Sequence, residues 1–253
     1  MIEVEMHRNI GLLRMAHGKA NAMDLELCEA ITARLEEHRH SSPQALVLTG
    51  QGQIFSAGVD LLRVLDGGAA YLERFLPALS KAFETLFCFP KPVVAAINGH
   101  AIAGGCVLAC GADYRIMTRE SGRIGVPELL VGIPFPTIAV EIMRCASAPE
   151  HFQTLLYSGA TFAPEDAAKR AIVNETTEPT KLLDLALAKA ESLAALPAAA
   201  FDLTKRQIHE PMMRQVRDNA ARFDATVREL WASPAGLAAI RGYVERTFKR
   251  SQK

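Results

Sequence analysis

The sequence predicts an α/β core that is followed by a helical C-terminal segment. Two short apolar runs, residues 45–49 and 92–97, each lead into a glycine-bearing turn, as buried parallel strands do. Residues 24–40 instead carry apolar side chains at helical spacing, so strands and helices alternate and right-handed crossovers are expected. Alanine and leucine dominate further along the chain. We place the core at residues 1–196 and the helical segment at residues 197–253.

The first half of the chain predicts strands and helices in turn. Residues 2–15 indicate two strands joined by a turn at Asn9-Ile-Gly11. Asp24 can cap the following helix, because its carboxylate can accept hydrogen bonds from the N–H groups of the first turn. Further along we expect a helix over about 70–87, a helix beginning near Gly104 and a strand near 114–117.

Three prolines divide the last part of the chain, at positions 197, 211 and 234. Proline lacks a backbone N–H and disrupts the interior of a helix. Residues 212–230, after the second proline, and residues 234–250, which begin with the third, have helical character. We therefore predict separate helices that begin or end near each proline.

Charge and hydropathy limit the class of protein. The 253 residues include 28 basic and 28 acidic side chains with no long run of one sign, which gives no attraction to nucleic acid or an anionic membrane. No stretch approaches the ~20 uninterrupted apolar residues that span a bilayer. The N-terminus lacks the basic and apolar segments of a signal peptide. We expect a cytoplasmic protein.

The five cysteines favour a reducing compartment, because their number is odd and no CxxC pair occurs. Cys106 and Cys110 are four residues apart and would share one face of a helix. No nearby histidine or acid completes a ligand set, so packing is the favoured interpretation and no metal is predicted.

Residues 55–60 form a candidate binding loop. Gly58 follows the strand over 45–49 across a short glycine-rich connection. A glycine permits positive φ and the close approach of a ligand, and the next N–H, on Val59, could then point into a cleft. The alternative is a turn that needs glycine for purely structural reasons.

Residues 98–106 carry a stronger signal. Small residues lie between a buried strand and a helix, so the N-terminus of that helix faces the carboxyl edge of the strand. Free N–H groups and the helix dipole favour negative charge there, and ligands of open α/β sheets bind at this edge. The alternative is that Gly104 and Gly105 only allow close helix packing.

Glu128 stands within an apolar run, Arg123–Pro134. Burial among apolar neighbours would raise the pKa of this carboxyl and suit it to proton transfer. The alternative is a solvated surface glutamate.

Motifs for several other chemistries are missing. The chain has no GxSxG elbow, no HExxH and no Walker A sequence. Gly50-Gln-Gly52 starts like a dinucleotide fingerprint but lacks the third glycine, so no nicotinamide site is predicted.

Taken together, the three segments resemble those of the crotonase (enoyl-CoA hydratase/isomerase) superfamily in order, spacing and residue identity. The match runs from Lys19-Ala-Asn-Ala-Met23 through residues 55–61, 98–113 and 127–133 to Trp231–Gly236. The resemblance implies a crotonase-like spiral of ββα units with a C-terminal helical trimerisation segment. It also implies an acyl-CoA substrate, a homotrimer or dimer of trimers, and no cofactor beyond the coenzyme A carried by the thioester.

The resemblance also assigns roles to individual residues. The N–H groups of Val59 and Gly104 match the oxyanion hole that stabilises a thioester enolate, where one donor is typically worth ~3–4 kcal/mol. Four positions match the path of coenzyme A: Lys19, Ala22, Ser56 and Ala57. Asp60, counted with this coenzyme A set, matches the acid of the motif, and we interpret it as supporting the loop.

Hydratases of this family use two glutamates to hold and activate water. Glu128 matches the second, whereas the first position is occupied by Val107. Members that keep only the second acid are typically Δ3-Δ2-enoyl-CoA isomerases. Dehalogenase and dienoyl-isomerase types need an aspartate where this chain has Phe135-Pro136, and we interpret the next acid, Glu141, as an exposed helix residue.

We therefore predict an enzyme that moves a double bond from the 3- to the 2-position of an enoyl-CoA, with Glu128 as the single acid/base. The alternatives are a hydratase that uses one glutamate, another crotonase-type reaction such as decarboxylation or thioester hydrolysis, and a non-catalytic acyl-CoA-binding protein. The apolar surroundings of Glu128 count against the last, because a buried acid is costly without a purpose.

Overall fold

A computed structural model describes residues 1–251, with side chains described through residue 247. Over this range the chain forms two sheets, whose strands come together from distant parts of the sequence. The larger sheet has, in spatial order, β1 (Ile2–His7), β2 (Ile10–Met15), β3 (Ala45–Thr49), β5 (Val93–Ile97), β7 (Tyr114–Thr118) and β10 (Glu175–Thr177). The smaller sheet has, in spatial order, β4 (Ile54–Ser56), β6 (His100–Ile102), β8 (Ile124–Gly125) and β9 (Thr161–Phe162).

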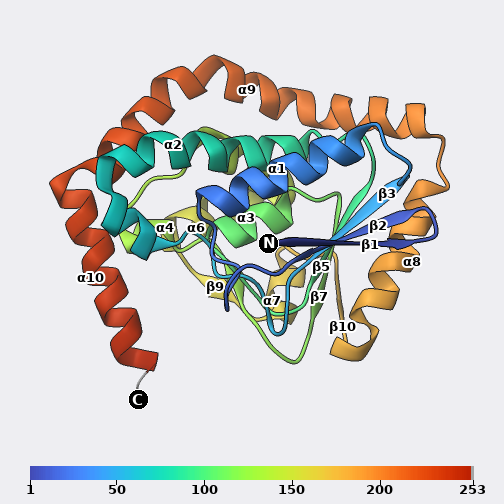
Figure 1. Ribbon diagram of the computed structural model, residues 1–253, viewed down its shortest axis with the longest axis horizontal. Coiled ribbons are helices and arrows are strands. Elements are labelled where there is room, and N and C mark those ends of the chain that lie inside the picture. The colour runs from blue at the N-terminus through green and yellow to red at the C-terminus, as the bar shows by residue number, and fades with distance from the viewer. Residues whose placement is uncertain (252–253) are drawn as a thin grey trace.

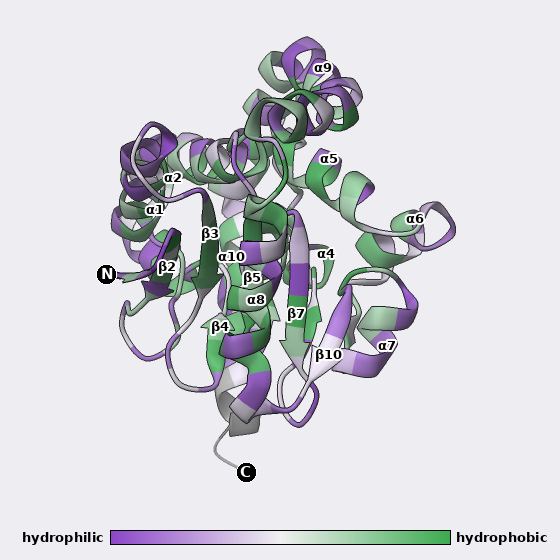
Figure 2. Cartoon of the chain, turned by 90° about the vertical axis from the view of Figure 1, so that its right-hand side faces the viewer, coloured by the Kyte–Doolittle hydropathy of each residue, from purple (hydrophilic) through white to green (hydrophobic). Residues whose placement is uncertain are grey.

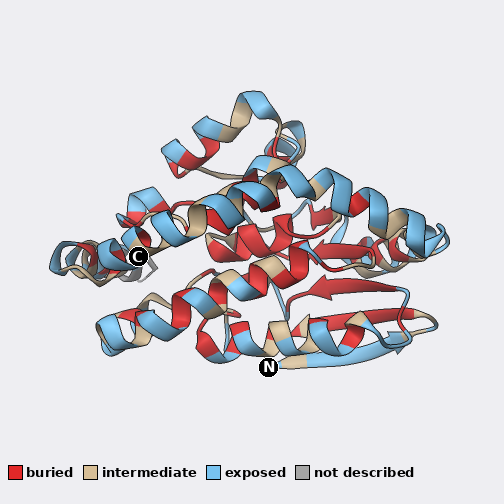
Figure 3. Cartoon of the chain, turned by 90° about the horizontal axis from the view of Figure 1, so that it is seen from above, coloured by how far each residue is buried: buried red, intermediate tan, exposed pale blue. Residues whose placement is uncertain are grey.

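The larger sheet is parallel from β2 to β10, and only its edge strand β1 runs antiparallel. Val47 in the middle of β3 pairs with Leu12 on one side and with Val94 on the other. Every residue of β3 and β5 is buried, whereas most of β1 is exposed, and Figure 3 shows this contrast. The continuous apolar runs of the sequence therefore became the central strands, as expected for strands covered on both faces.

The chain order gives the fold its spiral form, with each turn contributing one strand to each sheet and then a helix. These turns are β3–β4–α2, β5–β6–α3 and β7–β8–α4. The helices of the core are α1 (Leu25–Arg39), α2 (Leu61–Phe87), α3 (Gly104–Cys110), α4 (Glu128–Val131), α5 (Thr137–Ala146), α6 (Pro149–Ser158), α7 (Pro164–Lys169), the 3₁₀ turn η1 (Pro179–Lys181) and α8 (Leu182–Ala194). The predicted spiral of ββα units is confirmed.

Helices cover both faces of the larger sheet. Helix α8 packs on β3, β5 and β7, and Leu182, Ala186 and Ala190 join the apolar side chains of that face (Figures 1 and 2). The main core lies on the other face, under α1, α2 and α3. Asp24 caps α1 as predicted, since its carboxylate accepts a 2.8 Å hydrogen bond from the N–H of Leu27.

Helix α2 has a part that the sequence predicted and a part that it did not. Gly68, at φ 53° and ψ −145°, is not helical and divides α2 at a kink, and the second part agrees with the helix predicted over about 70–87. The first part starts at Leu61, because the carboxylate of Asp60 accepts hydrogen bonds from the N–H groups of Leu62 and Arg63. The sequence analysis did not predict these first turns, because the two consecutive glycines at positions 67 and 68 have low helix propensity.

The C-terminal segment folds back over the core of its own chain. Helix α9 (Ala198–Ala232) lies along α2 and α5, and α10 (Pro234–Ser251) packs on α2 and α4 (Figure 1). The expectation that Pro211 separates two helices was wrong, because α9 continues through it. Packing of α9 along α2 and α5 offsets the missing hydrogen bond of that proline.

Two contacts attach the first half of α9 to the core. The ammonium of Lys205 donates a 2.9 Å hydrogen bond to the carboxylate of Asp113, and the Lys205 side chain is 5% exposed. The imidazole of His209 stacks on Phe87 with ring centroids 3.7 Å apart, and its Nδ1 donates to the Phe87 carbonyl at 3.0 Å.

None of the helices in the described part of the chain combines the length and the apolar character that a membrane span needs.

Candidate active site

A buried cavity of about 70 Å³ collects the residues that the sequence singled out. Val59 and Ala57 reach it from the loop after β4, Gly104 and Val107 from α3, and Glu128 from the start of α4. The rest of its wall is apolar and comes from α2, the residues before α5, and the C-terminal helices. Three motifs that are far apart in the sequence therefore meet at one small site.

Backbone hydrogen bonds hold Val59 in place. The carbonyl of Gly58 accepts a hydrogen bond from the N–H of Met23 at 2.8 Å, and the N–H of Asp60 donates to the Met23 carbonyl at 3.0 Å. Val59 lies between these two bonds in an isolated parallel bridge with Met23. Its own N–H has no acceptor in the described part of the chain, so this donor is available to a ligand in the cavity.

A strained residue aims the N–H of Gly104. Ala103 adopts φ 52° and ψ −127°, a conformation that L-residues rarely enter, and its N–H donates to the Gly125 carbonyl at 2.8 Å. The Ala103 carbonyl accepts from Cys106 and Val107, which starts α3. Within residues 1–251 the N–H of Gly104 meets no acceptor, and it stands at the positive end of the helix.

Gly58 allows these two donors to approach each other. It has φ +85°, and a Cβ atom at this position would lie 2.5 Å from the Ile102 carbonyl oxygen and 3.3 Å from the Gly104 nitrogen. The contact with the Ile102 oxygen is too close for any Cβ atom, and the contact with the Gly104 nitrogen would be tight. The pair of N–H groups can stabilise an oxygen atom that gains negative charge in the cavity.

Glu128 brings a basic group to the same cavity. Its side chain is buried at 7% exposure, and its Oε2 atom has no hydrogen-bond partner among the described residues. Burial in these apolar surroundings raises the pKa of the Glu128 carboxyl to about 8. Such a carboxylate is a stronger base than a solvated glutamate and is free to accept a proton.

Val107 lines the cavity as well and is 1% exposed. Of the described residues around this cavity, Glu128 is the sole acid. Phe135 and Pro136 also contribute to the wall, where they present apolar surface. The site therefore combines one carboxylate with mainly apolar walls.

Glu141 is not the exposed helix residue that we expected. It is 5% exposed, and the Arg144 guanidinium donates to its carboxylate at 3.1 Å. Helix α5 packs against α3, α6 and α9, so almost all of its faces are covered. Glu141 lines a neighbouring cavity rather than the one that holds Glu128.

Among the predicted coenzyme A positions, Ala57 is directly at the cavity. Its N–H donates to the carbonyl of Ala20 at 3.0 Å, which attaches the loop of Lys19 and Ala22 to the β4 strand. Lys19 is exposed and Ala22 is half-buried. The structure thus places the segments around Lys19, Ala22 and Ala57 side by side near the cavity.

The side chains of Ser56 and Asp60 form hydrogen bonds within the protein. Ser56 is fully buried, and its hydroxyl donates to the Asn21 carbonyl at 2.7 Å and accepts from the N–H of Gly58 at 3.2 Å. Asp60 caps α2. Their geometry supports the loop, so we assign both side chains a structural role.

Sequence reasoning did not select Asn21 as a site residue. Asn21 is 2% exposed with φ 46°, and its side-chain amide accepts from the N–H of His17 and donates to the Phe55 carbonyl. It joins the loop of Lys19 to the β4 strand. An asparagine beside a loop glycine is a recognisable signal, because asparagine tolerates positive φ and bonds to nearby backbone.

Trp231 and Tyr243 were missed for a different reason. They line the cavity from α9 and α10, and the indole N–H of Trp231 donates to the Pro134 carbonyl at 2.9 Å. Both lie more than a hundred residues after Glu128 in a segment that we assigned to assembly. No local pattern marks them, since only the return of α9 and α10 over the core brings them to the site.

Comparison with known proteins agrees with this geometry. The family model described as enoyl-CoA hydratase/isomerase matches residues 5–248. A putative enoyl-CoA hydratase of Thermus thermophilus is 34% identical over 203 residues, which cover 78% of this chain and 79% of the relative. The mitochondrial enoyl-CoA delta isomerase 1 of mouse is 27% identical over 213 residues, covering 83% of this chain and 74% of the relative.

The fold has a close counterpart among solved structures. The human mitochondrial delta3-delta2-enoyl-CoA isomerase superposes with a TM-score of 0.94 at 22% identity, and the match covers 98% of each chain. With a family model that spans nearly the whole sequence and a spiral of ββα units, the chain belongs to the crotonase (enoyl-CoA hydratase/isomerase) superfamily.

Proposed function

We propose that this protein is an enoyl-CoA isomerase that converts a 3-enoyl-CoA thioester into the conjugated 2-enoyl-CoA. The observation that carries the proposal is the isolated carboxylate. Glu128 shares a small apolar cavity with two unpaired backbone donors, and Val107, which lines the same cavity, matches the position of the first glutamate of hydratases.

In this mechanism the Glu128 carboxylate removes a proton from C2 of the substrate. The electron pair of that C–H bond forms the new C2=C3 double bond, and the former C3=C4 bond supplies the pair that later takes a proton at C4. Between the two steps the charge is shared with the thioester oxygen as a dienolate. Glu128 returns the same proton to C4, so no net proton is gained or lost.

The N–H groups of Val59 and Gly104 would hold the thioester oxygen during this step. Both donors are fixed before substrate arrives, by the Met23 bridge and by the strained Ala103. Donors that need no reorganisation contribute the most where charge develops. The apolar wall favours the shuttle further, because water in the cavity would compete for the proton and for the dienolate.

Coenzyme A would lie along the loops of Lys19, Ala22, Ser56, Ala57 and Asp60, with Ser56 and Asp60 shaping the path through the backbone bonds described above. No further cofactor is required by this chemistry. The homotrimer or dimer of trimers, the role of residues 197–253 in assembly and the cytoplasmic location stay predictions from the sequence.

A hydratase with a single glutamate is the second candidate. It is favoured by the relative of Thermus thermophilus, which is named as a putative enoyl-CoA hydratase. That reaction needs water at C3, activated by Glu128 alone. Val107 can neither bind nor activate water, which is why we rank this candidate below the isomerase.

The deciding experiment uses two substrates. Purified protein is incubated with trans-3-hexenoyl-CoA, and the absorbance of the conjugated thioester is followed, with hydration of crotonyl-CoA measured in parallel. We expect isomerisation with little hydration. Hydration at a comparable or higher rate would instead favour the second candidate, and inactivity on both would reject both proposals.

A further inference from the structure

A side-chain hydrogen bond closes the loop between β2 and α1. The imidazole Nε2 of His17 lies 2.7 Å from a carboxylate oxygen of Asp24, and Nε2 is the donor because a carboxylate accepts. Residues 18–23 lie between the two side chains and include Lys19 and Ala22, two positions matched to coenzyme A. His17 therefore joins the two ends of a segment that the proposed function assigns to the coenzyme A part of the substrate.

The backbone of His17 also holds this loop. Its N–H donates to the side-chain oxygen of Asn21 at 2.8 Å, and its carbonyl accepts from the Asn21 N–H at 3.0 Å. Gly18 and Asn21 have φ values of 58° and 46°, in the left-handed region that most residues avoid. Because such a conformation is costly for a residue with a side chain, it persists only where the surrounding bonds fix it.

Asp24 is a fixed point for the bond with His17. Its side chain is 9% exposed, and its carboxylate also accepts from the N–H of Leu27, which caps α1. The N–H of Leu25 donates to the Tyr71 hydroxyl at 3.0 Å, so the start of α1 is bonded to α2. His17 thereby connects the loop to a helix start that is itself held in place.

The exposed part of the loop lacks attachments of its own. Ala20 and Met23 are bonded to residues that follow β4, whereas Gly18 and Lys19 are exposed. Within the described residues the Lys19 side chain forms neither a hydrogen bond nor an ion pair, so its ammonium is available to the phosphates of coenzyme A. The placement of Gly18 and Lys19 therefore depends on His17 at one end and on Ala20 at the other.

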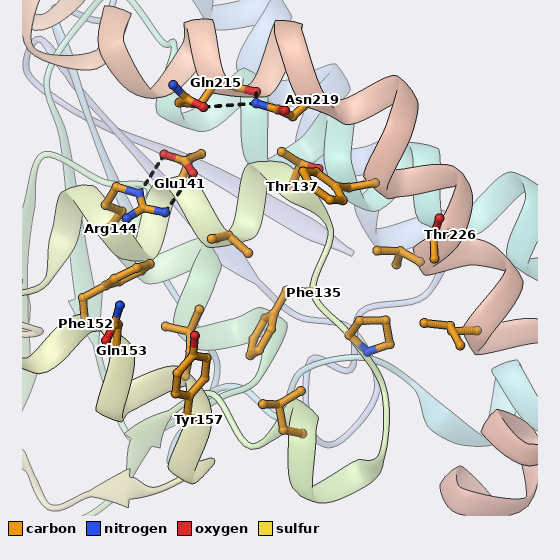
Figure 4. Close-up of a pocket in the computed structure, with 17 residues that line it drawn as sticks. Phe135, Thr137, Glu141, Arg144, Phe152, Gln153, Tyr157, Gln215, Asn219 and Thr226 are labelled. Carbon is orange, nitrogen blue, oxygen red and sulfur yellow. Dashed lines mark hydrogen bonds and ion pairs between the residues drawn. The ribbon is translucent and has the colours of Figure 1, made fainter.

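An ion pair within a helix does not constrain the chain in this way. Arg144 and Glu141 are three residues apart on α5, and Figure 4 shows their pair beside the neighbouring cavity. Such a pair joins side chains that the helix already holds next to each other. His17 and Asp24 are seven residues apart and no helix lies between them, so their bond restricts the loop that they enclose.

We propose that His17 is a positioning residue for coenzyme A, because its hydrogen bond to Asp24 keeps residues 18–22 in the shape that binds this part of the thioester. The inference rests on the proposed function, since it takes the ligand to be a coenzyme A thioester. Without the bond the loop samples other conformations, and the apparent affinity decreases with the fraction of molecules that keep the binding one. Glu128 is held separately, at the start of α4, so the chemical step should not change.

The test compares two amide side chains at position 17. His17→Gln places its amide nitrogen close to the position of Nε2 and can still donate to Asp24. His17→Asn is shorter and cannot reach Asp24, and His17→Ala replaces it if that variant does not fold. His7→Asn is the matched control, because His7 lies 3.6 Å from the Glu5 carboxylate at the opposite end of the β1–β2 pair.

Free coenzyme A is the probe in calorimetric titrations. We expect His17→Asn to bind it at least about tenfold more weakly than the unmodified protein, as for the loss of a hydrogen bond to a charged group. His17→Gln and His7→Asn should stay within about threefold of the unmodified protein. Equal affinity of His17→Asn and the unmodified protein would overturn the inference, and so would an equally large loss in His17→Gln.

Amide hydrogen exchange in the absence of ligand separates positioning from direct contact. The N–H of Asn21 is bonded to the His17 carbonyl, and it should exchange at least about tenfold faster in His17→Asn than in His17→Gln. Weaker binding of coenzyme A with unchanged exchange would mean that the imidazole itself contacts the ligand. The positioning role would then be wrong.

Turnover separates this inference from the proposed function. His17→Asn should raise KM for trans-3-hexenoyl-CoA at least about tenfold with kcat within about twofold. Its kcat/KM should not change for the trans-3-hexenoyl thioester of N-acetylcysteamine, which lacks most of coenzyme A, and an equal loss for both thioesters would contradict the inference. If neither thioester is converted but the affinity for coenzyme A depends on His17 as expected, only the proposed function is rejected. Failure of the unmodified protein to bind coenzyme A would reject the inference.

Discussion

Val107 and Glu128 line the same cavity, so the carboxylate shares its surroundings with a valine side chain rather than with a second acid. Val107 extends from the first turns of α3, and Glu128 is the first residue of α4. This relationship separates the two reactions considered above. Water addition needs a second polar group, whereas a proton shuttle is helped by its absence.

We predict that Val107→Glu gains hydration of crotonyl-CoA and loses at least about tenfold in isomerisation, because a second acid can hold water next to the substrate. Two carboxyls in one cavity also oppose the ionisation of each other. The measurement is the rate of both reactions for the variant. Val107→Gln is the control of similar size, and a gain of hydration there as well would show that acidity at this position is not the cause.

Glu128→Gln should lower isomerisation by about 10²–10⁴-fold, the usual contribution of a positioned acid/base. Affinity for hexanoyl-CoA should stay within about threefold, because the amide has nearly the shape of the carboxyl. Stopped assays measure the isomerisation rate, and calorimetry measures the affinity for hexanoyl-CoA. Unchanged turnover in this variant would remove Glu128 from the mechanism.

The raised pKa of Glu128 has consequences for pH dependence. Activity needs the carboxylate, so kcat/KM should rise with pH and level off above about pH 8. For stability, the folded protein keeps this proton between about pH 4.5 and 8 while the unfolded chain does not, so the contribution of Glu128 decreases as pH rises through this window. Glu128→Gln should therefore raise Tm more at pH 8.5 than at pH 5, and an equal rise at both would contradict the assignment.

Gly58→Ala tests the pair of backbone donors. A Cβ atom would collide with the Ile102 carbonyl at a residue with φ +85°, which would move the N–H of Val59 away from that of Gly104. We expect a loss of about 10²-fold in kcat, comparable to losing one oxyanion donor. Gly52→Ala is the control, because Gly52 also has positive φ (+62°) but open space around it, so this variant should lose stability without losing kcat.

His209 makes the attachment of α9 sensitive to acid. Burial, aided by the nearby Lys205 charge, lowers the pKa of His209 to about 4. Between about pH 6.5 and 4 the unfolded chain binds a proton that the folded protein does not, so stability falls as pH decreases through this window. His209→Phe keeps an aromatic ring on Phe87 without a titrating group. Urea unfolding at pH 7 and pH 5 should show a smaller loss for this variant than for the unmodified protein.

The sequence by itself predicted the alternation of strands and helices and the segments that form the candidate site. Continuous apolar runs became the central strands, and the loops around Gly58 and Gly104, together with the apolar-flanked Glu128, were recognisable because their signals are local. A cap, a turn or a buried strand depends on neighbours within a few residues. The cap at Asp24 could be predicted on the same basis, whereas the meaning of Val107 and the spiral of ββα units came from the resemblance to the crotonase superfamily.

Only the tertiary structure decided the properties of the site. The raised pKa of Glu128 depends on its burial, and the free N–H of Val59 depends on which bonds Met23 makes with its neighbours. Trp231 and Tyr243 reach the cavity because α9 and α10 fold back over the core, and packing of α9 on α5 also helps to bury Glu141. Burial and cavity shape are sums of contacts between distant segments, and no local pattern in the chain encodes them.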